Sequence, residues 1–155
     1  MSEQESMRLG PIEFWAMNNP VRRWIQKHIE FHTFKKHLFK HGINLNGRTI
    51  MDAGCGSGYS TKLILNEFSP VKIIAFDLMP EQIRLARRRG LPVDFFTADL
   101  TRLDLPHSVC DAVFIFGILH HIPEWRTALQ EVSRVLSPGG VFPCSEPQYR
   151  FTWPE

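Results

Sequence analysis

The stretch that decides the fold is IMDAGCGSGYS, residues 50–60, in which a short apolar run ends in Asp52 and glycines follow at positions 54, 56 and 58. An apolar run followed by a cluster of glycines predicts a buried strand, a tight turn and the start of a helix. Glycine at every second position of the turn leaves the backbone bare, so a ligand can approach it closely. We therefore expect this loop to be the centre of a binding site.

Strand and helix patterns alternate on both sides of this loop. Strands are expected at 48–53, 71–77, 93–99, 110–117 and 139–145, the last after the turn LSPGG, and helices at 59–68, 80–89 and 124–136. Ser57 or Ser60 is expected to cap the first of these helices. The alternation predicts an α/β fold, a Rossmann-like, doubly wound parallel sheet of about five strands in the order 3-2-1-4-5, with helices on both faces.

The chain before residue 47 follows a different pattern. Apolar residues recur at three- and four-residue steps from Pro20 to His41, which predicts an amphipathic helix closed by Gly42, and a shorter helix is expected before it. We expect a helical cap over residues 1–46 and an α/β domain over residues 47–155, which together form one compact domain. The aromatic side chains expected to contact the core or act as a lid are Phe14, Trp15 and Trp24.

Composition excludes several classes of protein. With 155 residues, 43% apolar and 22% charged, the chain has the size and content of one globular domain. Its longest apolar run, residues 112–119, is too short to span a membrane, and the acidic N-terminus lacks the pattern of a secretory signal, so we expect a cytoplasmic protein. Residues 1–48 carry eight Lys or Arg against four Glu. We interpret these cations as a solvated helix face, which makes a nucleic-acid partner unlikely on the sequence alone.

The third glycine separates two classes of cofactor. A dinucleotide fingerprint, G-x-G-x-x-G, would need glycine at position 59, where the chain has Tyr59. The observed G-x-G-x-G led by Asp52 resembles the first motif of the class I S-adenosylmethionine-dependent methyltransferases. A sulfonium cofactor carries positive charge and no phosphate, so nearby carboxylates suit it better than they suit a pyrophosphate. A generic strand-to-helix turn is the alternative.

The resemblance implies S-adenosylmethionine as the cofactor, S-adenosylhomocysteine as its product, and a set of residues at the strand ends. Asp77 would accept the ribose hydroxyls, Leu78 and Met79 would pack on the adenine, and Asp99 beside Leu100 would receive the adenine amino group. For Asp77 the alternative is a helix N-cap, and for Asp99 a turn carboxylate. The remaining implied cofactor-binding residues are Asp52, Gly54, Cys55, Gly56, Ser57, Gly58, Phe116 and Gly117.

Residues 110–140 resemble the corresponding block of small-molecule methyltransferases akin to those of ubiquinone and menaquinone biosynthesis. His120 and His121 follow the fourth strand and are candidates for a general base at the acceptor site. Adjacent histidines before Pro123 can equally pack or cap a turn, and both interpretations stay open. No metal site is expected, because no third ligand accompanies the histidine pairs His28/His32 and His37/His41 of the helix expected at 20–41, the front helix.

The resemblance therefore implies an enzyme that transfers a methyl group to an O, N or C atom of a small molecule. The alternatives are a non-catalytic S-adenosylmethionine-binding subunit that needs a partner chain, and an RNA-directed methyltransferase or binder. FGILHH after the fourth strand, in place of an NPPY-type motif, counts against the latter.

The family has two further strands after the fifth, so the domain is C-terminally short. Pro143 suits an edge strand, and an exposed fifth strand favours a homo-oligomer.

Overall fold

The computed structural model describes residues 10–145, without the side chains of Glu13, Phe14 and Met17. Its helices are α2 (Pro11–Asn18), α3 (Pro20–Ile25), the π-helical η1 (Gln26–Phe31), α4 (His32–Lys40), α5 (Tyr59–Phe68), α6 (Pro80–Arg87), the 3-10 turn η2 (Leu119–His121) and α7 (Trp125–Val135). Its strands are β1 (Thr49–Ala53), β2 (Lys72–Asp77), β3 (Phe95–Thr97), β4 (Cys110–Phe116), β5 (Leu136–Val141) and β6 (Cys144–Ser145). No helix in this part of the chain has the length and hydropathy to cross a bilayer.

The strands form one parallel sheet in the order β3-β2-β1-β4-β5, with β6 also paired to β4. This confirms the predicted strand order. The central strand β1 pairs with β2 through Met51 and Ile74 and with β4 through Met51 and Val113. Because the strands are parallel, the carboxyl ends of β1, β2 and β4 meet at one edge of the sheet.

Two short strands, β5 and β6, take the place of the single fifth strand predicted at 139–145. Leu136 pairs with Cys110 and Val141 with Ala112, so six residues of β5 lie opposite three of β4 and the turn LSPGG bulges out. After the bulge Cys144 pairs with Ile115. Pro143 separates the two short strands, and its carbonyl accepts a hydrogen bond from the N–H of Ile115 at 3.0 Å. Proline has no N–H to donate, which is why the strand is interrupted at this residue.

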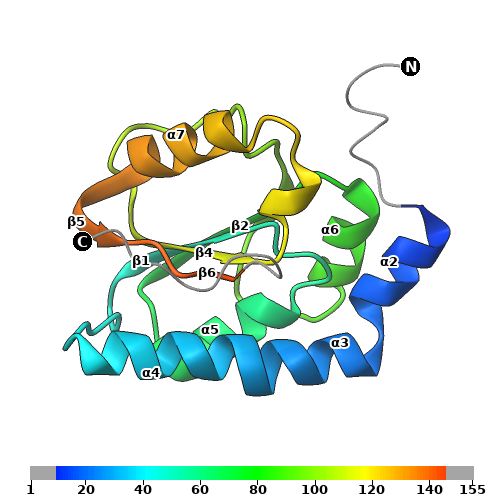
Figure 1. The fold of residues 1–155 in the computed structure, drawn as a ribbon, viewed down its shortest axis with the longest axis horizontal. Helices are drawn as coiled ribbons and strands as arrows, with labels where there is room; N and C mark the ends of the chain where they lie inside the picture. Colours follow the sequence, from blue (N-terminus) through cyan, green and yellow to red (C-terminus); the bar gives the residue numbers. More distant parts are fainter. Residues whose placement is uncertain (1–9, 146–155) are drawn as a thin grey trace.

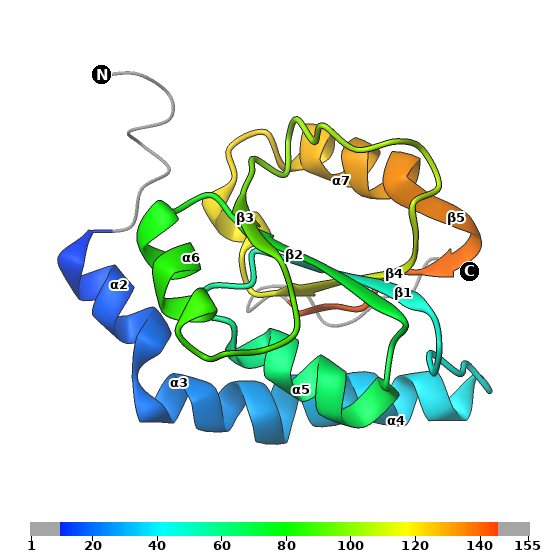
Figure 2. The same ribbon diagram turned by 180° about the vertical axis from the view of Figure 1, so that it is seen from behind.

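Helices cover both faces of the sheet, as predicted. On one face α4, α5 and α6 enclose a core that includes Phe34, Ile64 and Ile83 with the strand residues Ile50 and Phe114. On the other face α7 and the segment after β3 enclose the second core. Figure 1 shows α7 on one side of the sheet and α4 with α5 on the other, and Figure 2 shows the same layers from behind. The sheet is therefore the middle of three layers.

The predicted amphipathic helix at 20–41 forms as α3, η1 and α4 in direct succession. Gly42 ends it with φ 65°, and the N–H of Ile43 donates to the carbonyl of Leu38 at 2.9 Å, as in a Schellman motif. Its buried face carries Phe31, Phe34 and Leu38.

Of the aromatic side chains expected to contact the core or act as a lid, two do not pack in the core, and their role as a lid stays a prediction. Trp15 is 69% exposed and Trp24 is 57% exposed. The third, Phe14, has a side chain outside the described part of the structure. The buried face of the front helix starts at Phe31, so the core is reached only about two turns after Trp24.

Candidate functional site

The glycine loop lies between β1 and α5 and is tied to the end of β2. The N–H groups of Gly54 and Cys55 both donate to the carbonyl of Phe76 at 2.9 Å. One residue further, the N–H of Gly56 donates to Oδ2 of Asp77 at 2.9 Å. These bonds bring the first motif and the predicted ribose carboxylate together at the carboxyl edge of the sheet.

The three glycines of the motif have different surroundings, although φ is positive at each of them. A side chain on Gly54 would collide with Ile118, and one on Gly58 would lie 3.1 Å from the Cβ of Ala86 on α6. A Cβ on Gly56 would meet nothing nearer than Oε1 of Gln82 at 4.0 Å. Among the three, Gly56 alone leaves open space over the backbone for a ligand, while the other two permit close packing.

Asp52 lies beneath the loop and has no exposed surface. Its Oδ2 accepts hydrogen bonds from the hydroxyls of Ser60 at 2.7 Å and Thr61 at 2.6 Å, which anchors the first turn of α5. Its Oδ1 is buried and has no partner among the described residues. Burial raises the pKa of Asp52 from 3.8 to about 6, and the two hydroxyl donors only partly offset this effect.

The predicted cap of α5 is wrong. Gly58 occupies the N-cap position, and no side chain caps the helix. The hydroxyl of Ser60 is used by Asp52, and Ser57 accepts hydrogen bonds from Arg89 through its carbonyl and its hydroxyl. Ser57 is also buried, so this loop residue is held by the protein itself.

Asp77 binds backbone on both sides of its carboxylate. Oδ2 accepts from Gly56, and Oδ1 accepts from the N–H of Met79 at 2.9 Å. Burial raises the pKa of Asp77 above its usual value, and the amides of Met79 and Gly56 oppose the shift. A carboxylate has about four acceptor sites, so each oxygen can still accept a ligand hydroxyl. The Asp77 side chain therefore shapes the loop at β2 and retains the capacity to bind a ribose.

The predicted adenine contacts divide into apolar and polar members. Met79 and Leu100 are buried, and Leu78 is half-buried. Asp99 accepts hydrogen bonds at Oδ1 from the N–H of Thr101 at 2.8 Å and from its hydroxyl at 2.7 Å. The turn carboxylate is thus present in the structure, and Oδ2 of Asp99 is the atom left for a ligand.

Two predicted cofactor contacts point into the protein rather than toward the edge. Cys55 is 3% exposed, and burial raises the pKa of its thiol far above the usual range. The ring of Phe116 packs on Phe34, with centroids 5.2 Å apart, so Phe116 offers only its backbone to the edge. At these two positions the predicted binding role can involve only main-chain atoms.

Arg22 and Glu30 were not predicted and lie at the end of β4. Their side chains form an ion pair at 2.8 Å, and the guanidinium donates to the carbonyl of Phe116 at 3.5 Å. A Cβ on Gly117 would lie 3.4 Å from Arg22. Nothing in the sequence indicated this contact, because it depends on how the front helix docks against the sheet.

Gln82 is another residue that the sequence analysis missed. It is 3% exposed, and its Oε1 has no partner among the described residues. A signal did exist, since Gln82 precedes Ile83 and shares with Ala86 the buried stripe of α6. A polar residue in an apolar stripe calls for an explanation.

His120 and His121 lie on η2, directly after Ile118, which covers Gly54. Both side chains are exposed, and their ring centroids lie 3.9 Å apart. They stand at the rim beyond β4, where they were expected. The role of His120 and His121 at the acceptor site stays a prediction.

Comparison with known proteins identifies the family. A family model described as a methyltransferase domain matches residues 50–140, more than half of the chain. Trans-aconitate 2-methyltransferase of Azoarcus sp. (strain BH72) is 33% identical over 100 residues, which are 64% of this chain and 39% of the relative. Fatty-acid O-methyltransferase of Mycolicibacterium smegmatis is 31% identical over 114 residues, 72% of this chain and 42% of the relative.

The chain thus spans about two fifths of the length of these curated relatives. Among solved structures, an S-adenosylmethionine-dependent methyltransferase from Mesorhizobium loti has a TM-score of 0.61 and 28% identity, and the match covers 69% of this chain and 50% of that one. This chain carries the glycine motif at residues 54–58 and the strand order β3-β2-β1-β4-β5. It therefore belongs to the methyltransferase domain family, whose cofactor is S-adenosylmethionine.

Proposed function

We propose that this chain binds S-adenosylmethionine at the carboxyl edge of the sheet and takes part in methyl transfer to a small-molecule acceptor. The observation that carries the proposal is the junction of Gly56 and Asp77, where open backbone lies beside a carboxylate with unused acceptor sites. The buried Oε1 of Gln82 is the atom nearest to a Cβ placed on Gly56.

The polar atoms at this junction fit the chemistry of the cofactor. The carboxylate of Asp77 and the Oε1 of Gln82 are acceptors, and the ribose hydroxyls and the ammonium of S-adenosylmethionine are donors. A pyrophosphate presents acceptors only, so the buried Oε1 of Gln82 next to the open backbone of Gly56 does not suit it. When bound, S-adenosylmethionine supplies an electrophilic methyl group on a positively charged sulfur.

The residues of the chain would act mainly by binding, alignment and exclusion of water. Met79 and Leu100 present buried apolar surface next to Asp77 and Asp99, which favours a dry adenine site. His120 and His121 would accept a proton from a hydroxyl acceptor at the rim. A carboxylate acceptor is already ionised at neutral pH and needs no base.

The named acceptors of two relatives favour an organic acid. One relative is named for trans-aconitate and the other for O-methylation of fatty acids. We therefore propose a carboxylate oxygen as the acceptor atom, from among the O, N and C atoms that the sequence resemblance left open. On this proposal, His120→Ala and His121→Ala leave the rate with a carboxylate acceptor within about twofold, because no proton has to be removed.

The decisive experiment is calorimetric titration of the 155-residue chain with S-adenosylmethionine and S-adenosylhomocysteine, with NAD as the control ligand. We expect micromolar binding of the first two and none of NAD. Asp77→Asn should weaken binding about tenfold, the effect of one lost charge-assisted hydrogen bond. Asp94→Asn alters an exposed carboxylate after α6 and should bind like the wild type. Equal affinity of the Asp77→Asn and Asp94→Asn variants would refute the site.

Location and assembly belong to the same proposal. The buried thiols of Cys55 and Cys110 lie outside any disulfide, which is usual for cytoplasmic proteins and supports that location. Within residues 10–145 no strand pairs with the outer edge of β5. This edge supports a homo-oligomer, and sedimentation velocity over a range of protein concentrations would detect it.

A further inference from the structure

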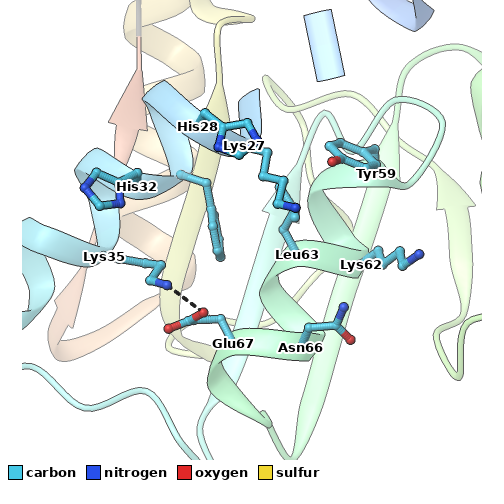
Figure 3. Close-up of a pocket in the computed structure, with 10 residues that line it drawn as sticks. Lys27, His28, His32, Lys35, Tyr59, Lys62, Leu63, Asn66 and Glu67 are labelled. Atoms are coloured by element: carbon cyan, nitrogen blue, oxygen red, sulfur yellow. Dashed lines mark hydrogen bonds and ion pairs between the residues drawn. The ribbon is translucent and has the colours of Figure 1, made fainter. Parts of the chain in front are cut away.

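A pocket of about 480 Å³ lies between the front helix and α5 (Figure 3), and neither Gly56 nor Asp77 is among its lining residues. The residues from α5 share one face of that helix, and they are Tyr59, Lys62, Leu63, Asn66 and Glu67. The residues opposite belong to η1 and the start of α4, and they are Lys27, His28, Phe31, His32 and Lys35. The volume falls in the range of small-molecule sites.

The lining carries a surplus of positive charge. Three lysines and two histidines line the pocket, and Glu67 is the one carboxylate among the lining residues. Glu67 is already used, since its Oε2 lies 2.8 Å from Nζ of Lys35 and this ion pair closes one end of the pocket. The charges of Lys27 and Lys62 therefore have no counter-charge within the lining (Figure 3).

The other end of the pocket is also cationic. Figure 3 shows Lys27 facing Tyr59 across the space between the two helices. The guanidinium of Arg89 lies 5.7 Å from the centre of the Tyr59 ring, and that of Arg23 lies 6.0 Å from it. Burial lowers the pKa of Arg89, and the nearby Arg23 lowers it further. Neither arginine lines the pocket, but both add positive charge around Tyr59, which favours a bound anion.

The pocket has an apolar floor, and the positive charge around it does not suit the cofactor. Phe31 is 5% exposed and Leu63 is half-buried, so apolar surface lies beneath the ring of cations. S-adenosylmethionine carries a sulfonium and an ammonium, which the lysines would repel. A compact anion with two or more charges satisfies both Lys27 and Lys62 and leaves the apolar floor to pack against its carbon skeleton.

We propose that this pocket binds a compact, multiply charged anion whose charged groups are phosphates or carboxylates. The site is separate from the methyl-transfer edge, although Tyr59 directly follows Gly58 of the glycine loop. Inorganic pyrophosphate and citrate are suitable probes, because together they distinguish the two kinds of charged group. Acetate, with a single charge, is the control ligand.

The test is titration of the full chain with each probe at constant ionic strength, followed by chemical shifts or calorimetry. We expect saturable binding of pyrophosphate or citrate and none of acetate. The double variant K27Q/K62Q should weaken binding at least about tenfold, since two charge-assisted contacts are lost. The matched control K36Q/K72Q removes the same charge from two exposed lysines outside the lining and should bind like the wild type.

Three results would overturn the proposal. The first is no saturable binding of either probe by a chain that circular dichroism shows to be folded. The second is equal weakening in K27Q/K62Q and K36Q/K72Q, which would mean general attraction to net charge. The third is displacement of pyrophosphate by a single-stranded RNA whose affinity falls steeply with salt, which would make the surface a nucleic-acid site.

Discussion

Asp52 is a carboxylate with no exposed surface, held by two hydroxyls beneath the glycine loop. Burial raises its pKa to about 6, compared with 3.8 for the ordinary group. Between these two values the folded chain binds more protons at Asp52 than the unfolded chain does. The free energy of unfolding must therefore fall as the pH rises through this window.

We predict that the free energy of unfolding falls by about 2 kcal/mol more in the wild type than in Asp52→Asn between pH 4.5 and pH 7.5. The variant keeps an acceptor oxygen for Ser60 and Thr61 but cannot ionise. Urea unfolding at the two pH values measures the difference, and it also cancels the contribution of the histidines, which both proteins share. Parallel pH profiles of the two proteins would contradict a raised pKa at this residue.

The sequence predicted some features of the glycine loop and could not predict others. The spacing of the glycines correctly indicated a tight turn between β1 and α5. The spacing could not show that the two glycines have different surroundings. Gly56 faces open space, whereas Gly54 packs under Ile118. Ile118 is distant in sequence, and its contact with Gly54 arises only after β4 pairs with β1. The same applies to Asp52, whose burial depends on how α5 folds back over β1.

At the scale of elements, an ion pair within the front helix holds the guanidinium that reaches the end of β4. The side chains of Arg22 and Glu30 in this pair are 18% and 17% exposed, whereas those of Lys35 and Glu67, which link α4 to α5, are each 38% exposed. Less water reaches the first pair, so its charges interact more strongly and are more costly to leave unpaired.

We predict that Arg22→Met lowers the free energy of unfolding by about 1–3 kcal/mol, because Glu30 and the Phe116 carbonyl lose their donor. Lys35→Met is the matched control and should cost less than about 1 kcal/mol, as expected for an exposed pair. Urea unfolding gives both values. Hydrogen exchange should accelerate over α3 and η1 in the Arg22 variant only, and equal effects of the two substitutions would contradict the argument.

Most elements were predictable because their patterns are local. The bounds of α5 agree with the prediction at both ends, and β1, β2, β3 and β4 lie inside the predicted ranges. The π-helical η1 was not predicted, since three- and four-residue spacing cannot distinguish a π turn within a helix. The bulge between Leu136 and Val141 was expected as a turn, but its pairing with β4 on both sides was not, because pairing is a non-local property.

At the scale of the whole molecule, the strand order follows from general rules of parallel sheets, while the way the N-terminal helices join the sheet does not. The sequence suggested a helical cap over residues 1–46 and an α/β domain over residues 47–155, which together form one compact domain. In the structure Phe34 of the front helix lies with its ring centroid 5.7 Å from that of Phe114 and 5.2 Å from that of Phe116. The cap and the sheet thus share one hydrophobic core.

A shared core predicts a single cooperative unit, because opening α4 exposes the same apolar surface that stabilises β4. We expect the slowest amides of α4 and of β4 to exchange with free energies of opening within about 1 kcal/mol of each other, and with the same dependence on urea. Phe34→Ala should lower both by about 3–5 kcal/mol, the usual cost of truncating a buried phenylalanine. Phe39→Ala, on the same helix but 88% exposed, should change neither. If α4 lost its protection in Phe34→Ala while β4 kept its own, the front helix would be a separate unit that opens independently of the sheet.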